Sequence, residues 1–218
     1  MADSALQRKN MVESQVRPSD VTDRRITAAM QDIARETFVP SKAERALAYM
    51  DGAVPVGGGR AMMAPRTLAR LMQLADLEPT SKVLIVGALT GYSAAIASRM
   101  AAKVVALEVD ASLASAAREN LASIGAANVE VVGGGLAAGY ADGAPYDAII
   151  VDGAVEDLPE ALFAQLAQGG RLVAIKARQG LGRAVVATKV ANTPSERVAF
   201  DASAPLVPGF ERPASFIF

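Results

Sequence analysis

The residue types and spacing best suited to chemistry lie in the middle of the chain. The apolar stretch KVLIVG, which starts at Lys82, predicts a buried β-strand followed by a turn from Gly87 to Gly91. A second apolar stretch, KVVALE, ends at Glu108, about 20 residues after that turn. When a strand, a glycine-bearing turn and such an acid follow in this order, the acid accepts hydrogen bonds from two ribose hydroxyls. The pattern therefore favours a nucleoside site formed by the turn and Glu108.

The spacing of the glycines limits which nucleoside-containing cofactor the site could bind. A dinucleotide fingerprint needs glycine at the first, third and sixth positions, where this chain has Gly87, Leu89 and Tyr92. NAD and FAD are therefore disfavoured. S-adenosylmethionine has no pyrophosphate to place at this turn, and its enzymes use a looser GxGxG pattern. The alternative interpretation is that Gly87 and Gly91 only form the turn that any strand–helix unit needs, and that Glu108 is solvated.

Composition excludes several other chemistries. The 218 residues contain no Cys and no His, which excludes disulfides and thiolate chemistry and removes the commonest general base and metal ligand. We therefore expect no metal site. The net charge is −1, so nothing favours nucleic acid or an anionic membrane as a partner. No apolar run approaches the ~18 residues that would span a bilayer, and the first residues lack a secretory signal pattern, so we expect a cytoplasmic protein.

Alternating strands and helices are predicted to position these residues. We expect strands at 82–87, 103–108, 128–132, 147–152 and 171–176, and helices at 91–100, 110–125 and 159–168. This alternation predicts an α/β fold with a Rossmann-like, doubly wound and mostly parallel sheet. In such sheets ligands bind beyond the carboxyl ends of the strands, which adds Asp152 to the candidate site.

The flanking segments differ from this core. Helices are expected at 4–16 and 22–35, the second with Thr22 as its N-cap, and another helix follows Pro65. The stretch 48–65, with three consecutive glycines, is predicted to be a loop. Strand-like pieces at 184–190, 196–200 and 214–218 are expected to add antiparallel edge strands. We expect one domain over 1–218, divided into N-terminal helices and loop (1–80), a nucleoside-binding core (81–183) and C-terminal strands (184–218).

Segments along most of the chain resemble one family. They are FVP at 38–40, AYxDxxxPVGxG at 48–59, VLIVGALTGY, VALEVD, APYDAIIVDGA and LPEALFAQLAQGGRLV. Their order and spacing, from about Lys9 to Phe200, resemble the protein-L-isoaspartate O-methyltransferase family. The resemblance implies a Rossmann-like enzyme that uses S-adenosylmethionine to methylate the free carboxylate of isoaspartyl residues in age-damaged proteins and peptides.

The resemblance also assigns the site. It implies cofactor contacts from Gly87, Ala88, Leu89, Thr90, Gly91, Glu108, Gly134, Gly135, Leu136 and Asp152. In the active-site loop the family has a Thr-Ile-Ser run, and the position of the serine is Met63 here. Met63 and the flanking Arg60 and Arg66 are thus the candidate catalytic residues.

Several departures from the family pattern fall in this site. Ile85 replaces an acid on the first strand, Leu89 replaces the middle glycine of GxGxG, and Gly135 replaces an acid that faces the adenine amino group. A side chain at Leu89 needs another direction, or the ligand another pose, and we expect it to project toward the methionine part of the cofactor and to leave less space than is usual in the family. Met63 offers no hydrogen-bond donor to a substrate carboxylate, which leaves Arg60 and Arg66 as the candidates for binding that carboxylate. The alternative is that both arginines are solvated.

Two functions remain open at this point. The first is an S-adenosylmethionine-dependent carboxyl methyltransferase of the isoaspartate-repair type, with weak or altered activity. A carboxylate is already ionised at pH 7, so its methylation needs no general base and the lack of His does not oppose it. The second is a catalytically silent family member that acts as a binding or regulatory module. The oligomeric state is left open.

Overall fold

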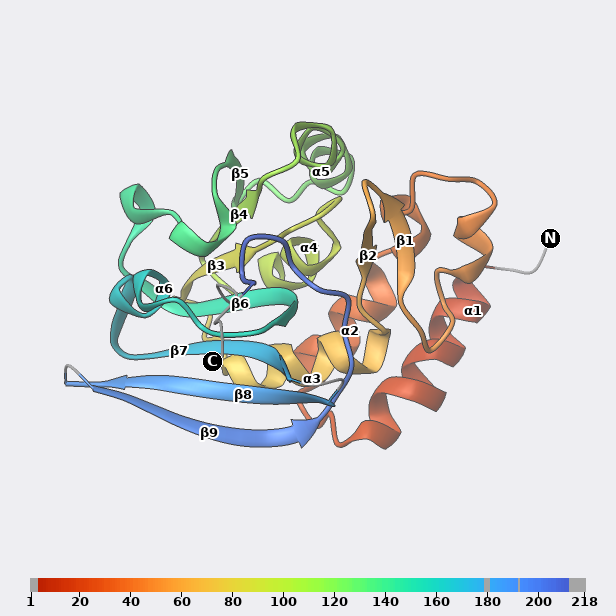
Figure 1. Ribbon diagram of the computed structural model, residues 1–218. Helices are drawn as coiled ribbons and strands as arrows, with labels where there is room; N and C mark the ends of the chain where they lie inside the picture. Colours follow the sequence, from red (N-terminus) through yellow and green to blue (C-terminus); the bar gives the residue numbers. More distant parts are fainter. Residues whose placement is uncertain (1–3, 179–180, 192, 212–218) are drawn as a thin grey trace, which may run out of the picture.

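A seven-stranded sheet forms the centre of the computed structural model, which describes residues 4–178, 181–191 and 193–211. The strand order is β5-β4-β3-β6-β7-β8-β9 (Figure 1). The strands are β3 (Lys82–Val86), β4 (Lys103–Glu108), β5 (Val129–Gly133), β6 (Tyr146–Val155), β7 (Leu166–Arg178), β8 (Leu181–Val190) and β9 (Thr193–Asp201). Strands β3 to β7 are parallel, and β8 and β9 pair antiparallel at one edge. The predicted fold is confirmed, while the strand expected at 214–218 lies outside the described residues.

Both faces of the central parallel strands β3, β4 and β6 are buried over most of their length, which explains why these strands are largely apolar, whereas β5 at the edge is partly exposed. In β3, Val83 and Ile85 belong to the core on one face, and Leu84 and Val86 belong to the core on the other. Helices α3 (Pro65–Ala75), α4 (Tyr92–Ser98) and α5 (Ala111–Ser123) cover the first face, and α6 (Glu160–Ala164) packs on the second. The side chain of Asp110 begins α5 by accepting hydrogen bonds from two backbone N–H groups, at 2.8 and 3.1 Å.

The N-terminal helices are shorter than expected. Helix α1 (Ser4–Met11) continues as a π-helical turn and a 3-10 turn, while α2 (Arg24–Asp32) begins at the N-cap Asp23. The expected N-cap Thr22 was wrong because its N–H donates to the side chain of Gln73, leaving Asp23 to bond the N–H of Arg25. In the described ranges no helix has the length and apolar content that a membrane crossing requires.

A β-hairpin occupies the stretch that was expected to be a loop. Strands β1 (Val54–Gly57) and β2 (Arg60–Met62) pair antiparallel, with Val54 opposite Met62. Gly57, Gly58 and Gly59 have φ values of 102°, 59° and 71°, a left-handed region that glycine adopts at little cost. The glycines therefore form a tight turn that presents Arg60 to the sheet.

Two further bounds differ from the sequence expectation. Helix α6 ends at Ala164, and β7 already begins at Leu166, so the helix predicted at 159–168 was too long. After β9 the chain turns back over the sheet, where Ala154 of β6 forms a parallel bridge with Leu206 (Figure 1). This returning segment, residues 205–207, is called the strap below.

Candidate active site

The carboxyl ends of β3, β4 and β6 bring three predicted residues to one edge of the sheet. Strand β3 has β4 on one side and β6 on the other, so the strand order reverses here. Gly87 follows β3, Glu108 ends β4, and Asp152 lies near the end of β6. Arg60 contacts both Glu108 and the space above Gly87, so it joins these residues at the same edge. This edge is where open α/β sheets bind ligands.

Glu108 is the best-connected residue of the cluster. Its side chain has no exposed surface. Oε2 accepts a hydrogen bond from the Leu89 N–H at 2.8 Å, and Oε1 accepts bonds from the N–H groups of Val109 at 2.9 Å and Asp110 at 3.1 Å. A fourth donor, Arg60 Nη1, lies 3.1 Å from Oε1. Glu108 is therefore a dry, fixed carboxylate, and the alternative of a solvated side chain was wrong.

Arg60 lies inside the site rather than on the surface. It is 9% exposed and reaches from β2 to form an ion pair with Glu108. A Cβ placed on Gly87 would lie 3.1 Å from Arg60 Nη2, so the guanidinium covers the first glycine of the turn. Nη2 is buried and finds no hydrogen-bond partner among the described residues. For Arg60, solvation was the wrong alternative.

The turn itself is buried and tightly held. Gly87 and Gly91 have φ values of 77° and 100°, and Leu89 has a φ of 54°, which is uncommon for a residue with a Cβ. Leu89 is 1% exposed and belongs to the core on the face covered by α4 and α5. Its side chain has thus taken another direction. Ala88 is buried as well, and the hydroxyl of Thr90 donates to the Phe38 carbonyl at 2.6 Å.

The segment after β5 has exposed glycines followed by a buried leucine. Gly134 and Gly135 are exposed, and a Cβ on Gly135 would meet no atom within 4 Å. Leu136 is buried, with its Cδ1 atom 3.7 Å from a Cβ placed on Gly87. Space for the missing acid is therefore present at Gly135, while Leu136 helps to cover the turn.

Asp152 carries the clearest electrostatic signal of the site. Burial raises the pKa of its carboxyl from the ordinary 3.8 to about 6, although Ser93 and the positive charges of Arg35 and Arg60 oppose the change. Because this pKa lies above the value in the unfolded chain, ionisation of the carboxyl lowers the stability of the folded state. No group of side chains in residues 4–178, 181–191 and 193–211 is arranged to hold a metal ion.

Met63 does not face an open site. It is 1% exposed in the core, and its carbonyl accepts a hydrogen bond from Arg35 Nη2 at 2.6 Å. Arg35 is fully buried, donates through Nε to the Ala48 carbonyl at 2.8 Å, and lies over the ring of Tyr92 at 4.6 Å. Arg35 thus holds the two ends of the stretch 48–63 through its buried hydrogen bonds. This role was not predicted from the sequence, where Arg35 is the last residue of the helix expected at 22–35.

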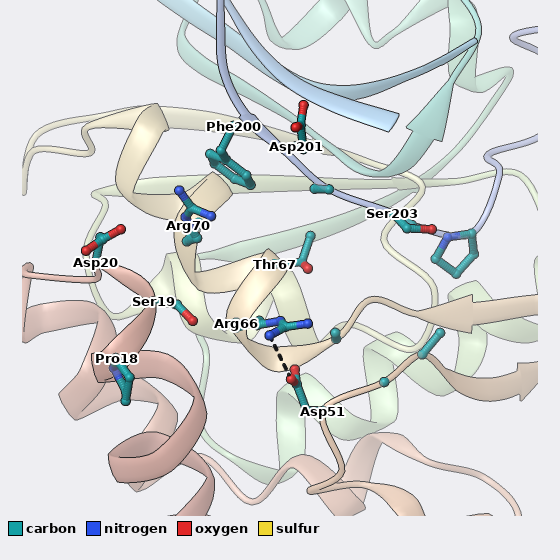
Figure 2. A pocket seen from close by; sticks show the side chains of 16 residues that line it. Pro18, Ser19, Asp20, Asp51, Arg66, Thr67, Arg70, Phe200, Asp201 and Ser203 are labelled. Carbon is teal, nitrogen blue, oxygen red and sulfur yellow. Dashed lines mark ion pairs between the residues drawn. The ribbon is translucent and has the colours of Figure 1, made fainter. Parts of the chain in front are cut away.

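Arg66 lies apart from the buried cluster and lines a cavity of about 850 Å³. Figure 2 shows Arg66 and Asp51 facing each other in an ion pair of 3.1 Å, with Arg70 beside the ring of Phe200. The Arg66 side chain is 55% exposed, and its role in binding a carboxylate stays a prediction. The structure therefore separates two residues that the sequence placed together, since Arg60 points to the turn and Arg66 to the cavity.

The strap joins the cavity to the turn and was also missed. Pro205 lines the cavity, and its carbonyl accepts a hydrogen bond from the Ala154 N–H at 2.7 Å. The Val207 N–H donates back to the Ala154 carbonyl at 2.8 Å, and Val207 Cγ1 lies 3.3 Å from a Cβ placed on Gly87. Only the two prolines around Leu206 and Val207 signalled an ordered segment in the sequence.

The donors and acceptors can be tested against the nucleoside part of S-adenosylmethionine. Glu108 is a buried acceptor at the correct strand end, and Gly87 leaves its Cα face without a side chain, as a close ligand requires. The guanidinium of Arg60 lies in front of both. The residues therefore fit the nucleoside once Arg60 has left Glu108.

Comparisons with known proteins place the chain in one family. Residues 6–207 match the model of the protein-L-isoaspartate(D-aspartate) O-methyltransferase family. A protein-L-isoaspartate O-methyltransferase from Methylorubrum populi is 44% identical over 173 residues, covering 79% of this chain and 80% of the relative. One from Methanoculleus marisnigri is 42% identical over 168 residues, covering 77% and 76%.

Solved structures agree with this placement. A protein-L-isoaspartate O-methyltransferase superposes with a TM-score of 0.82 at 25% identity, over 93% of this chain and 66% of that longer chain. A Plasmodium falciparum structure of a β-aspartate methyltransferase in complex with S-adenosyl-L-homocysteine has a TM-score of 0.76 at 21% identity, over 90% and 95%, and shares the fold. The predicted resemblance is confirmed, and the chain belongs to the protein-L-isoaspartate O-methyltransferase family.

Proposed function

We propose that this chain is an S-adenosylmethionine-dependent carboxyl O-methyltransferase that acts slowly on isoaspartyl groups of damaged proteins and peptides. Family membership over residues 6–207 supports the reaction class and the cofactor. Glu108 is the observation that carries the proposal, because a dry carboxylate at this strand end is suited to a ribose. The cytoplasmic location, the absence of nucleic-acid and membrane partners, and the division of the chain at residues 80 and 183 stay predictions.

The reaction asks little acid–base chemistry of the protein. When bound, S-adenosylmethionine supplies a methyl group on a positively charged sulfur. A substrate carboxylate is ionised at pH 7, so the chain need not remove a proton. Its residues instead hold and orient the reactants and exclude water. Glu108 would hold the nucleoside, and the strap and Leu136 would keep water from the turn.

The cavity beside the strap is our candidate for the substrate chain. It is lined by residues from the N-terminal segment, from the stretch 51–53, from the start of α3, and from the end of β9 and the chain after it. Ala64, directly after Met63, and Pro205, next to the strap's contact with the turn, both line it. Arg66 stands at this cavity with only an exposed acid as its partner, so it is available to a substrate carboxylate.

Two features account for slow turnover. At the position of the family serine, the Met63 side chain is buried and has no hydrogen-bond donor. Removing one donor aimed at a reacting oxygen commonly costs about 100-fold or more in rate. Arg60 in addition occupies the acceptor that the ribose needs.

A radiolabelled methyl-transfer assay tests the proposal. An isoaspartyl peptide is compared with its normal aspartyl twin, and we expect slow labelling of the isoaspartyl peptide alone. Arg66→Ala should raise KM for the peptide more than it lowers kcat. Equal labelling of both peptides would contradict the substrate assignment, and vigorous turnover would contradict the roles given to Met63 and Arg60.

A second candidate function is favoured by the Arg60–Glu108 pair. If the pair never opens, the chain is a catalytically silent member that keeps the fold as a binding or regulatory module. Calorimetric titration with S-adenosylhomocysteine separates the two candidates without a substrate. Binding supports the methyltransferase, and its absence up to millimolar concentration supports the silent module.

A further inference from the structure

We infer that Arg60 and the cofactor ribose compete for Glu108, so that Arg60 is a gate that sets the cofactor affinity of this chain. The inference rests on the proposed function, since it concerns the same site. It goes beyond that function by assigning the affinity to one residue of the β1–β2 hairpin.

The competition follows from the hydrogen bonds of Glu108. A carboxylate offers about four acceptor positions, two on each oxygen. Oε1 already receives the N–H groups of Val109 and Asp110 together with Arg60 Nη1, and Oε2 receives the Leu89 N–H. The three backbone donors belong to the turn and the strand end and stay in place. These four donors equal the number of acceptor positions, and Arg60 is the one among them that is a side chain, so a ribose hydroxyl competes with Arg60 for the carboxylate.

Arg60 is the displaceable partner because its own position is incomplete. Nη2 is buried beside Gly87 without a hydrogen-bond partner in the described residues, so the closed state leaves a charged donor unsatisfied. Arg60 also follows directly on Gly57, Gly58 and Gly59, whose backbone has wide conformational freedom. Its departure thus needs a change in the hairpin but none in the sheet.

The other residues over the turn cannot replace Arg60 in this role. Val207 Cγ1 and Leu136 Cδ1 lie 3.3 and 3.7 Å from a Cβ placed on Gly87, and both are apolar. They restrict space but offer nothing to Glu108. Charge competition is therefore specific to Arg60, and it can be separated from simple obstruction by the choice of substitution.

Calorimetric titration with S-adenosylhomocysteine provides the test. Arg60→Ala removes both charge and bulk, Arg60→Met removes the charge and keeps much of the length, and Arg60→Lys keeps the charge. We expect Arg60→Ala and Arg60→Met to tighten binding about tenfold or more, which corresponds to about 1.4 kcal/mol. Arg60→Lys should stay within a few-fold of the unaltered protein. Arg99→Gln, which loses an exposed arginine paired with Asp32, is the matched control and should leave the affinity unchanged.

The outcomes separate the gate from the function. If the unaltered protein binds and Arg60→Ala binds equally or more weakly, the gate is refuted while the proposed function stands. If neither protein binds, both are refuted. Tightening by Arg60→Ala but not by Arg60→Met would assign the effect to bulk and overturn the competition for Glu108.

Hydrogen exchange gives a readout that a purely structural role of Arg60 would not produce. Saturating S-adenosylhomocysteine should speed amide exchange over residues 54–62 while slowing it at Leu89, Val109 and Asp110. Slower exchange of the hairpin on binding would mean that Arg60 closes on the ligand, which would overturn the gate.

Discussion

The two partners of the Arg60–Glu108 pair should contribute very unequally to stability. Glu108→Ala leaves a buried guanidinium without a counter-charge, and breaking such a pair from one side costs about 3–5 kcal/mol. It also removes the acceptor of three backbone N–H groups, those of Leu89, Val109 and Asp110. We therefore expect a loss of about 4 kcal/mol or more, a large part of the 5–15 kcal/mol that is typical of a folded domain.

Arg60→Ala should cost much less. Glu108 keeps its three N–H donors, and the buried Nη2 that lacks a partner is removed at the same time. The expected loss is about 1–2 kcal/mol. The double variant lacks the uncompensated charge and should lie between the single variants, at about 2–3 kcal/mol. The resulting coupling energy between the two positions is on the order of 2–3 kcal/mol.

Urea unfolding followed by circular dichroism measures all three losses, with a common slope as the condition for comparing midpoints. The exposed pair of Arg99 and Asp32 is the control, and its coupling should be below about 1 kcal/mol. A coupling of Arg60 with Glu108 within about 0.5 kcal/mol of zero would show that the buried ion pair does not exist. The reasoning on both the site and the gate would then fail.

Three other positions give sharp tests. Burial raises the pKa of Asp152 to about 6, above its ordinary 3.8. The folded state therefore holds this proton more tightly than the unfolded state does, and the free energy of unfolding falls as the pH rises between these two values. The Asp152→Asn variant should therefore be more stable than the unaltered protein by up to about 3 kcal/mol at pH 7.5, and its urea midpoint should lack that pH dependence. Equal urea midpoints for the two proteins at pH 7.5 would contradict this. Gly135→Asp meets open space and should keep the unfolding midpoint while tightening S-adenosylhomocysteine about tenfold in calorimetry; unchanged affinity would mean that the acid does not reach the adenine. Gly153→Ala places a Cβ 2.5 Å from Val207 Cγ2 and should cost about 1–3 kcal/mol in urea unfolding, so a variant of full stability would show that the strap is not docked.

Leu89 can be assigned to the site from the sequence, but the effect of its side chain on the space in the site cannot. The sequence shows that a leucine stands where the family has glycine, and it predicts a side chain that projects toward the methionine part of the cofactor. The structure keeps the left-handed backbone and buries the side chain in the core. The site therefore loses less space at Leu89 than the substitution alone suggests.

The sheet was predictable because local patterns determine it. Strands such as β3 and β4 are apolar runs of the expected length, and Asp110 is a local N-cap signal for α5. The positions of Glu108 and Asp152 followed from the strand ends. These elements need no knowledge of distant contacts.

The hairpin, the strap and the burial of Arg60 depend on contacts between segments far apart in sequence. Strand β2 pairs only with its short neighbour, and Arg60 gains its partner from a residue 48 positions later. Arginine is usually exposed, so composition and periodicity favour the surface for it. Only tertiary packing places its charge inside.

The side chains that cover Gly87 also link the folding of the chain to its binding of a nucleoside. Residues that cover Gly87 come from β2, from the turn after β5 and from the strap, so the cover needs widely separated parts of the chain to have docked. A molecule whose sheet is formed but whose strap is detached still has Glu108 at the strand end and less material above Gly87. Such partly opened forms lie close in free energy to the native state in many proteins. In these forms Val207 no longer restricts the space above Gly87, but Arg60 must still leave Glu108 before a ribose can bind. Conditions that loosen the strap mildly should therefore raise the apparent affinity less than Arg60→Ala does.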